Sequence, residues 1–203
     1  MRKPMFQLFA NYNQNLNQAM IQAMKQLDTD SLLKNQHAFF GSILGTMNHL
    51  MVGDLIWLNR FNQFFNFKSL QILANFPKPT ALDTLLFDNL TAYATARTEL
   101  DNIIIALVEE VTESQLQQPM IYHNTKGQTF NREFGLLLSH FFNHQTHHRG
   151  QATTLLFQQG VDVGVTDFLL VIPNQLSNMK KNLKVLSKEG KSTWQKSSPS
   201  AMR

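Results

Sequence analysis

Four of the chain's seven histidines lie within nine residues, in the segment SHFFNHQTHHRGQ at 139–151. His140, His144 and His148 are four residues apart, so on a helix they form a stripe that rises one turn at a time along a single face. Neutral imidazole is the commonest metal ligand in proteins, and an i,i+4 pair can present two imidazoles to one ion. The stripe predicts a metal site; buried histidines with structural partners are the alternative.

A second segment, NHLMVGDLIW at residues 48–57, carries His49 on an apolar face. Gly45 and Gly53 lie one turn before and one turn after this histidine. A glycine inside a helix costs roughly 1 kcal/mol relative to alanine, so two glycines beside a histidine favour open volume next to its ring. A ligand or an ion with exchangeable waters would use that volume. Close approach of two helices is the other explanation for both glycines.

The apolar residues follow a helical period in four long segments, which predicts helices over residues 5–27, 37–62, 81–112 and 131–160. Thr80 and Asp83 resemble a capping box at the start of the third helix. Asn131 is the expected cap of the fourth, and Gly160 is its expected C′ residue. The stretch 113–130, with a turn at 124–127, predicts a short hairpin before the fourth helix.

Four amphipathic helices bury their apolar stripes most simply as a four-helix bundle, so the expected fold class is all-α. The connections at 63–80 and 113–130 are long for simple hairpins, and at least one is expected to cross over the bundle. We expect a bundle domain at residues 1–173. A basic C-terminal extension at 174–203 should follow, with a short helix at 175–187 and then a flexible tail.

Positive charge is concentrated at the C-terminal end. Residues 174–203 hold seven Lys and Arg against one acidic residue, whereas the whole chain has a net charge of +4. A basic tail is more typical of a solvated end than of a nucleic-acid footprint, so a nucleic-acid partner is not expected. The chain has no cysteine, no apolar run long enough for a membrane span and a poor signal peptide at its start. We therefore expect a soluble cytoplasmic protein.

The segments NHLMVGDLIWLNRF and HFFNHQTHHRGQ together resemble the DinB/YfiT-like family of metal-binding four-helix bundles. This family is distinct from the translesion polymerase that shares its name, and the resemblance extends over residues 5–172. It implies a divalent-metal site of three histidines, one from the second helix and two from the fourth. The matching residues are His49, His144 and His148. Zn²⁺ and Ni²⁺ both suit imidazole ligands, so either ion is compatible with the sequence.

Further residues are candidates for the pocket or for contacts that orient the ligands: His140, Asp54, Arg149 and His123. His140 is expected beside the ligands rather than among them, and His123 on the hairpin could reach the mouth of the site. Asp54 either orients a ligand histidine or forms a salt bridge to Arg149 or Arg60. We favour the salt bridge, because on a helix Asp54 lies far around the axis from His49.

The resemblance also implies an activity. Family members of known activity move small thiols or isomerise thiol adducts, and others are described as metal-dependent hydrolases. A bound ion would activate water or the thiolate of a small-molecule cosubstrate, and because the chain has no cysteine the thiol would come from outside. The family also implies a homodimer. Whether the protein is an enzyme stays open, since a non-catalytic metal-binding or stress-response protein is the alternative.

Overall fold

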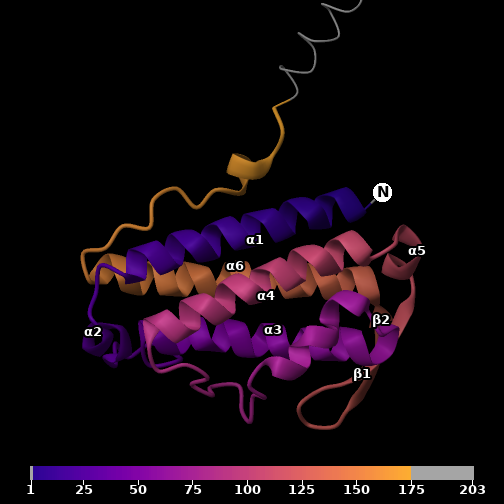
Figure 1. Cartoon of the computed structure of the whole chain (residues 1–203), viewed down its shortest axis with the longest axis horizontal. Coiled ribbons are helices and arrows are strands. Elements are labelled where there is room, and N and C mark those ends of the chain that lie inside the picture. The colour runs from indigo at the N-terminus through magenta and orange to yellow at the C-terminus, as the bar shows by residue number, and fades with distance from the viewer. Residues whose placement is uncertain (1, 175–203) are drawn as a thin grey trace, which may run out of the picture. The chain divides into compact units, whose positions relative to one another are not determined.

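The computed structural model describes residues 2–174, and four long helices lie side by side in it (Figure 1). They are α1 (Lys3–Met24), α3 (Ile43–Phe65), α4 (Leu90–Glu110) and α6 (Phe134–Gln158). The shorter elements are α2 (Thr29–Leu33), the 3₁₀ segments η1 (Lys68–Asn75) and η2 (Phe168–Val171), α5 (Glu113–Leu116), and the antiparallel hairpin of β1 (Pro119–His123) and β2 (Thr129–Glu133). The predicted all-α fold is confirmed, and the predicted hairpin is present.

The chain divides into two compact units, Met1–Phe168 and Leu169–Arg203. The bundle and the hairpin belong to the first unit. The helix predicted at 175–187 and the tail after it lie outside the described residues, and the domain boundary at residue 173 stays a prediction. None of the helices that the structure describes is long and apolar enough to span a membrane.

Helices α3 and α4 run in the same direction. Asn48, near the start of α3, hydrogen-bonds the backbone of Phe87, which lies just before α4. At the other end, Glu110 of α4 accepts a hydrogen bond from the backbone of Lys68, just after α3. The connection between these two helices therefore returns along the length of the bundle, as Figure 1 shows. This connection is a crossover of the kind expected from its length.

Helix α1 packs mainly on α4 and α6, and α3 packs mainly on α6. Each helix contributes an apolar stripe to one continuous core, because residues three and four apart share a helix face. Several of the largest core side chains are at most 1% exposed: Met20, Leu50, Phe61, Leu100, Leu107 and Phe141. The arrangement places the two histidine-bearing helices, α3 and α6, next to each other.

The third long helix begins at Leu90 rather than at residue 81 as predicted. Asn89 is its N-cap, and its side chain accepts a hydrogen bond from the amide of Ala92. Before it, the side chain of Asn48 donates to the carbonyl of Phe87 and accepts from the amide of the same residue, both at 2.9 Å. A helix would need those two backbone groups for itself, so the pairing with Asn48 keeps this stretch out of the helix.

The second long helix also begins later than predicted, at Ile43 instead of residue 37. Ser42 caps it by accepting a hydrogen bond from the amide of Gly45. His37 has a φ of 57°, a left-handed conformation that no right-handed helix accommodates. The periodic apolar pattern therefore runs past the true start of the helix, through a turn.

The predicted cap of the fourth helix is wrong. Asn131 lies within β2, where it pairs with Ile121 of β1, and α6 begins only at Phe134 without a side-chain cap. Gly160 has a φ of 79° and follows the C-cap Gln159, so the prediction for the C-terminal end is confirmed.

A buried ion-pair cluster connects the interiors of α3 and α4. Arg97 of α4 forms ion pairs with Asp54 of α3 at 2.6 Å and with Asp101 of α4 at 2.8 Å. All three side chains are at most 1% exposed. Desolvation raises the pKa of Asp101 to about 6, whereas the ion pair with Arg97 and the hydrogen bond from Asn17 oppose that rise. The cluster is stable only while each charge keeps its partners.

Amide side chains extend this cluster to α1 and α6. Gln145 of α6 donates to Asp54, and Asn13 and Asn17 of α1 donate to Asp101 at 3.2 and 2.9 Å. Arg149 of α6 donates to both asparagines. We call this set the central polar network: Asn13, Asn17, Asp54, Arg97, Asp101, Gln145 and Arg149. It carries two guanidinium and two carboxyl groups, and every long helix contributes to it.

The central polar network makes a testable contribution to stability. Asp54→Asn leaves the buried Arg97 with one of its two carboxylates, and we expect it to lower the free energy of unfolding by about 3–5 kcal/mol. The matched control is Glu133→Gln, because the ion pair of Glu133 with Arg2 is exposed and such pairs contribute about 0–1 kcal/mol. Urea denaturation measures both variants. Similar small losses in the two would contradict a structural role for the network.

Candidate metal centre

Three histidines from the two adjacent helices converge on one point. His49 projects from α3, and His144 and His148 project from successive turns of α6. One ring nitrogen of each lies within 4.8 Å of a ring nitrogen of the others. The structure thus brings together the three residues that the family resemblance implied as ligands, in positions suited to binding a metal ion.

The ring of His49 is held in one orientation. Its Nδ1 lies 2.7 Å from the carbonyl oxygen of Leu82. A carbonyl oxygen only accepts hydrogen bonds, so Nδ1 carries the proton and Nε2 keeps its lone pair. The ring of Phe40 stacks on the imidazole with centroids 3.7 Å apart. Metal-binding histidines commonly donate their second nitrogen to a carbonyl in this way, which fixes both tautomer and direction.

His148 is arranged like His49. Its Nδ1 lies 2.7 Å from Oε1 of Gln151, an oxygen that accepts, so Nε2 again keeps the lone pair. The Nε2 atoms of His148 and His49 are 3.2 Å apart. Two nitrogens bound to one ion in tetrahedral geometry are separated by about 3.3 Å. A cation between the two lone pairs would turn a repulsive contact into a bonded one.

His144 completes the cluster where Gly53 leaves room for its ring. A Cβ atom built on Gly53 would lie 2.7 Å from Cε1 of His144, closer than side chains tolerate. The open volume expected beside this glycine is therefore present, and His144 occupies part of it. Gly45 has a different reason: a Cβ there would meet the carbonyl oxygen of Phe40 at 2.2 Å. The prediction that both glycines open space beside His49 is thus wrong for Gly45.

All three histidines are driven toward the neutral form. Burial lowers the pKa of His144 to about 3, with further lowering from the neighbouring rings of His148 and His49. Burial likewise lowers the pKa of His49 and of His148, and outweighs the hydrogen bonds to Leu82 and Gln151 that act in the opposite direction. Because neutral imidazole is the metal-binding form, a proton competes poorly for these nitrogens.

A cavity of about 220 Å³ opens beside His49 and His144. His140 lines it, and its ring makes an edge contact with Trp57 at 5.2 Å. His140 therefore lies at the cavity beside the cluster. The turn of the hairpin reaches the cavity through Asn124 and Thr125.

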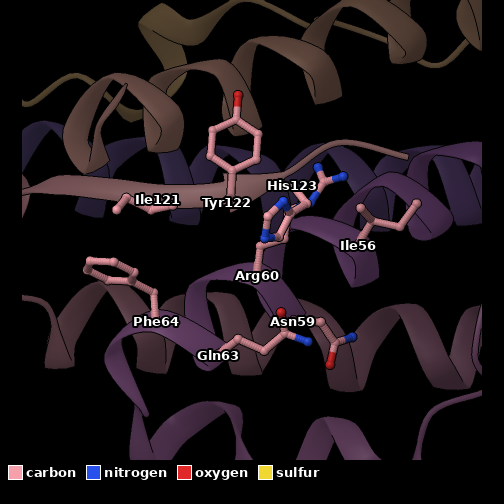
Figure 2. A pocket seen from close by; sticks show the side chains of 8 residues that line it. All are labelled: Ile56, Asn59, Arg60, Gln63, Phe64, Ile121, Tyr122 and His123. Carbon is pink, nitrogen blue, oxygen red and sulfur yellow. The ribbon is translucent and has the colours of Figure 1, made fainter. Parts of the chain in front are cut away.

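His123 lines a neighbouring pocket (Figure 2). Its Nδ1 lies 3.1 Å from the hydroxyl of Thr129. It does not line the cavity beside the cluster. The hairpin thus approaches the site as expected, but with the two residues that follow His123 rather than with His123 itself.

Asp54 and Arg149 belong to the central polar network. The salt bridge expected for Asp54 exists, but its partner is Arg97 and not Arg149 or Arg60. The side chain of Arg149 donates to Asn13, Asn17 and Gln145. Both side chains are buried, and none of the hydrogen bonds described for either reaches a histidine, so neither is placed to orient a ligand ring. Rotation around the helix explains this, since Asp54 is five residues from His49 and faces another direction.

Sequence reasoning missed three contacts that hold the rings. Gln151 follows His148 by three residues, so helical spacing alone would have found it. Leu82 contributes a backbone carbonyl from the crossover, and Phe40 comes from the turn before α3. Those two contacts depend on how loops return to the bundle, for which the sequence carries no periodic signal.

A helical bundle with three converging neutral imidazoles defines a class of protein suited to binding a metal ion. The chain belongs to the DinB family, whose model matches residues 1–181. It is also similar to the protein named DinB from Bacillus subtilis (strain 168), with 24% identity over 172 residues that cover 82% of this chain and 92% of that protein. No solved structure matches the chain.

The fit between Gly53 and His144 yields a prediction about metal affinity. Gly53→Ala should push the ring of His144 away from the other two, and we expect the affinity for Zn²⁺ or Ni²⁺ to fall about 10–100-fold. Gly150→Ala on α6 is the matched control, because a Cβ there meets nothing within 4 Å. Competition with a chromophoric chelator measures both affinities. An unchanged affinity in Gly53→Ala would show that His144 does not bind the ion.

Proposed function

We propose that the protein binds a divalent metal ion, Zn²⁺ or Ni²⁺, through His49, His144 and His148. The observation that carries this proposal is the pair of Nε2 lone pairs 3.2 Å apart, with His144 beside them. Three neutral imidazoles leave at least one coordination position for an exchangeable ligand, as in catalytic rather than closed structural zinc sites.

We further propose that the protein is a metal-dependent enzyme, either a hydrolase or a thiol-dependent transferase. When bound, the ion would supply Lewis acidity that lowers the pKa of a coordinated water or thiol toward neutrality. The chain's own contribution is to hold the rings of His49 and His148 in a fixed tautomer, to place His144 beside them and to shape the adjoining cavity. The substrate is a small molecule, because the cavity beside His49 and His144 measures about 220 Å³.

A non-catalytic metal-binding or stress-response protein is the alternative. It needs no space for a substrate, whereas a cavity adjoins two of the three histidines in the structure. This cavity is the reason for preferring the enzyme.

A cytoplasmic location and a homodimer are also parts of the proposal, and the dimer follows from the family resemblance alone. Light scattering at micromolar concentration should give the mass of two chains, and the mass of one chain would remove the dimer from the proposal.

Metal analysis of single substitutions tests the ligand set. We expect His49→Ala, His144→Ala and His148→Ala each to lose most of the bound metal, because two imidazoles hold a divalent ion far less tightly than three. His37→Ala and His123→Ala are the controls, since neither ring belongs to the cluster. Full metal content in His49→Ala would reject the site, because it would show that the two histidines of α6 suffice.

Activity assays separate the enzyme from the binding protein. The metal-loaded protein should hydrolyse activated esters or transfer a small thiol to an electrophile, and removal of the ion with a chelator should abolish the reaction. Restoring Zn²⁺ or Ni²⁺ should restore it. A fully loaded protein that is inactive across both substrate types would favour the non-catalytic alternative.

A further inference from the structure

Arg60 of α3 is a half-buried cation that has no acidic partner among the residues that the structure describes. Within residues 2–174, no hydrogen bond or ion pair engages its guanidinium, which instead lies 4.7 Å from the ring centroid of Trp57 and 5.5 Å from that of Tyr122. Burial lowers the pKa of Arg60, with Tyr122 acting in the opposite direction. Two aromatic faces thus hold the charge in place while its hydrogen-bond donors remain available.

Arg60 lies on the same face of α3 as the metal cluster. His49, Gly53 and Arg60 are separated by four and seven residues, which places them along one stripe of the helix. His49 and Arg60 are about 16 Å apart along the axis at their Cα atoms. Helical side chains lean toward the N-terminus, so the long side chain of Arg60 leans back toward His49. Its stacking over Trp57, one turn earlier, agrees with this direction.

Arg60 also lines two cavities. It lines the cavity of about 220 Å³ beside His49 and His144, and it lines a second cavity of about 300 Å³ between α3 and β1. Figure 2 shows the residues that line the second cavity: Arg60 reaches from α3 toward β1, Asn59 and Gln63 lie beside it on α3, and Tyr122 and His123 belong to β1. Ile56 is shared as well. Because Arg60 lines the same cavity as His49 and His144, a ligand at the metal cluster can contact the guanidinium.

The surroundings of Arg60 favour negative charge. Among the described residues that line the two cavities, none is an Asp or Glu. Arg132 of β2 adds a second positive charge nearby. Burial is the largest cause of the lowered pKa of His140, and the charges of Arg132 and Arg60 lower it further. An uncompensated guanidinium in a partly desolvated cavity attracts an anion more strongly than an exposed one does.

We propose that Arg60 binds a carboxylate group of the substrate or cosubstrate whose reacting atom lies at the three-histidine cluster. This inference rests on the proposed function and narrows its substrate to small carboxylic acids. One planar guanidinium matches one carboxylate through two parallel hydrogen bonds. A phosphate dianion would call for a second cation inside the cavity, whereas Arg132 does not line either one. The amides of Asn59 and Gln63 can accommodate polar groups further along the ligand.

Two matched probe pairs test the proposal by calorimetry. The first pair, mercaptohexanoate and mercaptohexanol with terminal thiols, is titrated into the metal-loaded protein and, for comparison, into the metal-free protein. The second pair, hexanoate and hexanol, is titrated into the metal-free protein. We expect the carboxylate member of each pair to bind at least about tenfold more tightly, the scale of a hydrogen bond to a charged group. We also expect mercaptohexanoate to bind the loaded protein more tightly than the metal-free one.

Variants distinguish direct binding by the Arg60 guanidinium from a general attraction of anions by positive charges near the cavities. Arg60→Met keeps an unbranched apolar stem against Trp57 and Tyr122 and should abolish the carboxylate preference. Arg60→Lys keeps the charge without the two-pronged geometry and should reduce the preference severalfold. Arg132→Met removes a nearby charge that lines neither cavity, so the preference should survive. Melting temperatures confirm folding, and the lysine variant carries the test if the methionine variant does not fold.

The outcomes distinguish this inference from the proposed function. If metal tightens binding of both thiols equally and the carboxylate adds nothing, the Arg60 site is rejected while the metal site stands. If hexanoate binds better than hexanol without metal but metal has no effect on the thiols, Arg60 is supported and the proposed function fails. Tighter binding of hexyl phosphate than of hexanoate would overturn the assignment to carboxylates. Equal losses in Arg60→Met and Arg132→Met would also overturn it.

Discussion

The hydrogen bond from Gln145 to Asp54 aligns the two helices on which the candidate site depends. Gln145 directly follows His144 on α6, and Asp54 lies five residues after His49 on α3. Both side chains are completely buried, so a slip of α6 along α3 would remove a hydrogen bond from the buried carboxyl group of Asp54 and leave the amide of Gln145 without that partner. The alignment of α3 and α6 that allows Gln145 to hydrogen-bond Asp54 in the bundle interior also brings His49, His144 and His148 together on another side of the two helices. The polar interior and the metal cluster are therefore two consequences of one helix alignment.

The positions of the three histidines have two different origins, one in the geometry of α6 and one in the crossover between α3 and α4. His144 and His148 share one helix face, so their spacing follows from α-helical geometry. The orientation of His49 depends on the crossover between α3 and α4, because that segment supplies the carbonyl of Leu82. Asn48, the preceding residue, holds the same segment through the backbone of Phe87. Asn48 of α3 thus holds the crossover in place, and the adjacent His49 donates a hydrogen bond to a carbonyl of the same crossover.

The sequence predicted the elements with local signals and missed those determined by distant contacts. Apolar periodicity located the four helices, and Gly160 marked the end of α6, because both signals are local. The starts of α3 and α4 were misplaced, since a periodic pattern continues through the turn at His37 before α3 and through the segment before α4 that Asn48 holds out of the helix. The three histidines, His49, His144 and His148, were predicted from the family resemblance and from the spacing of histidines on α6. The partner of Asp54 could not be predicted, because four helices supply the network and no pattern specifies which cation meets which carboxylate.

We propose that three imidazoles from α3 and α6 bind one divalent ion and leave one coordination position open. X-ray absorption spectroscopy of the protein loaded with Zn²⁺ tests it most directly, because the extended fine structure counts the imidazole ligands and measures their distances. We expect three imidazole nitrogens at about 2.0–2.1 Å and one further oxygen or nitrogen ligand. Addition of a small thiol should replace that ligand with sulfur at about 2.3 Å. Two imidazole ligands, or four with no exchangeable ligand, would show that the three histidines do not form an open metal site.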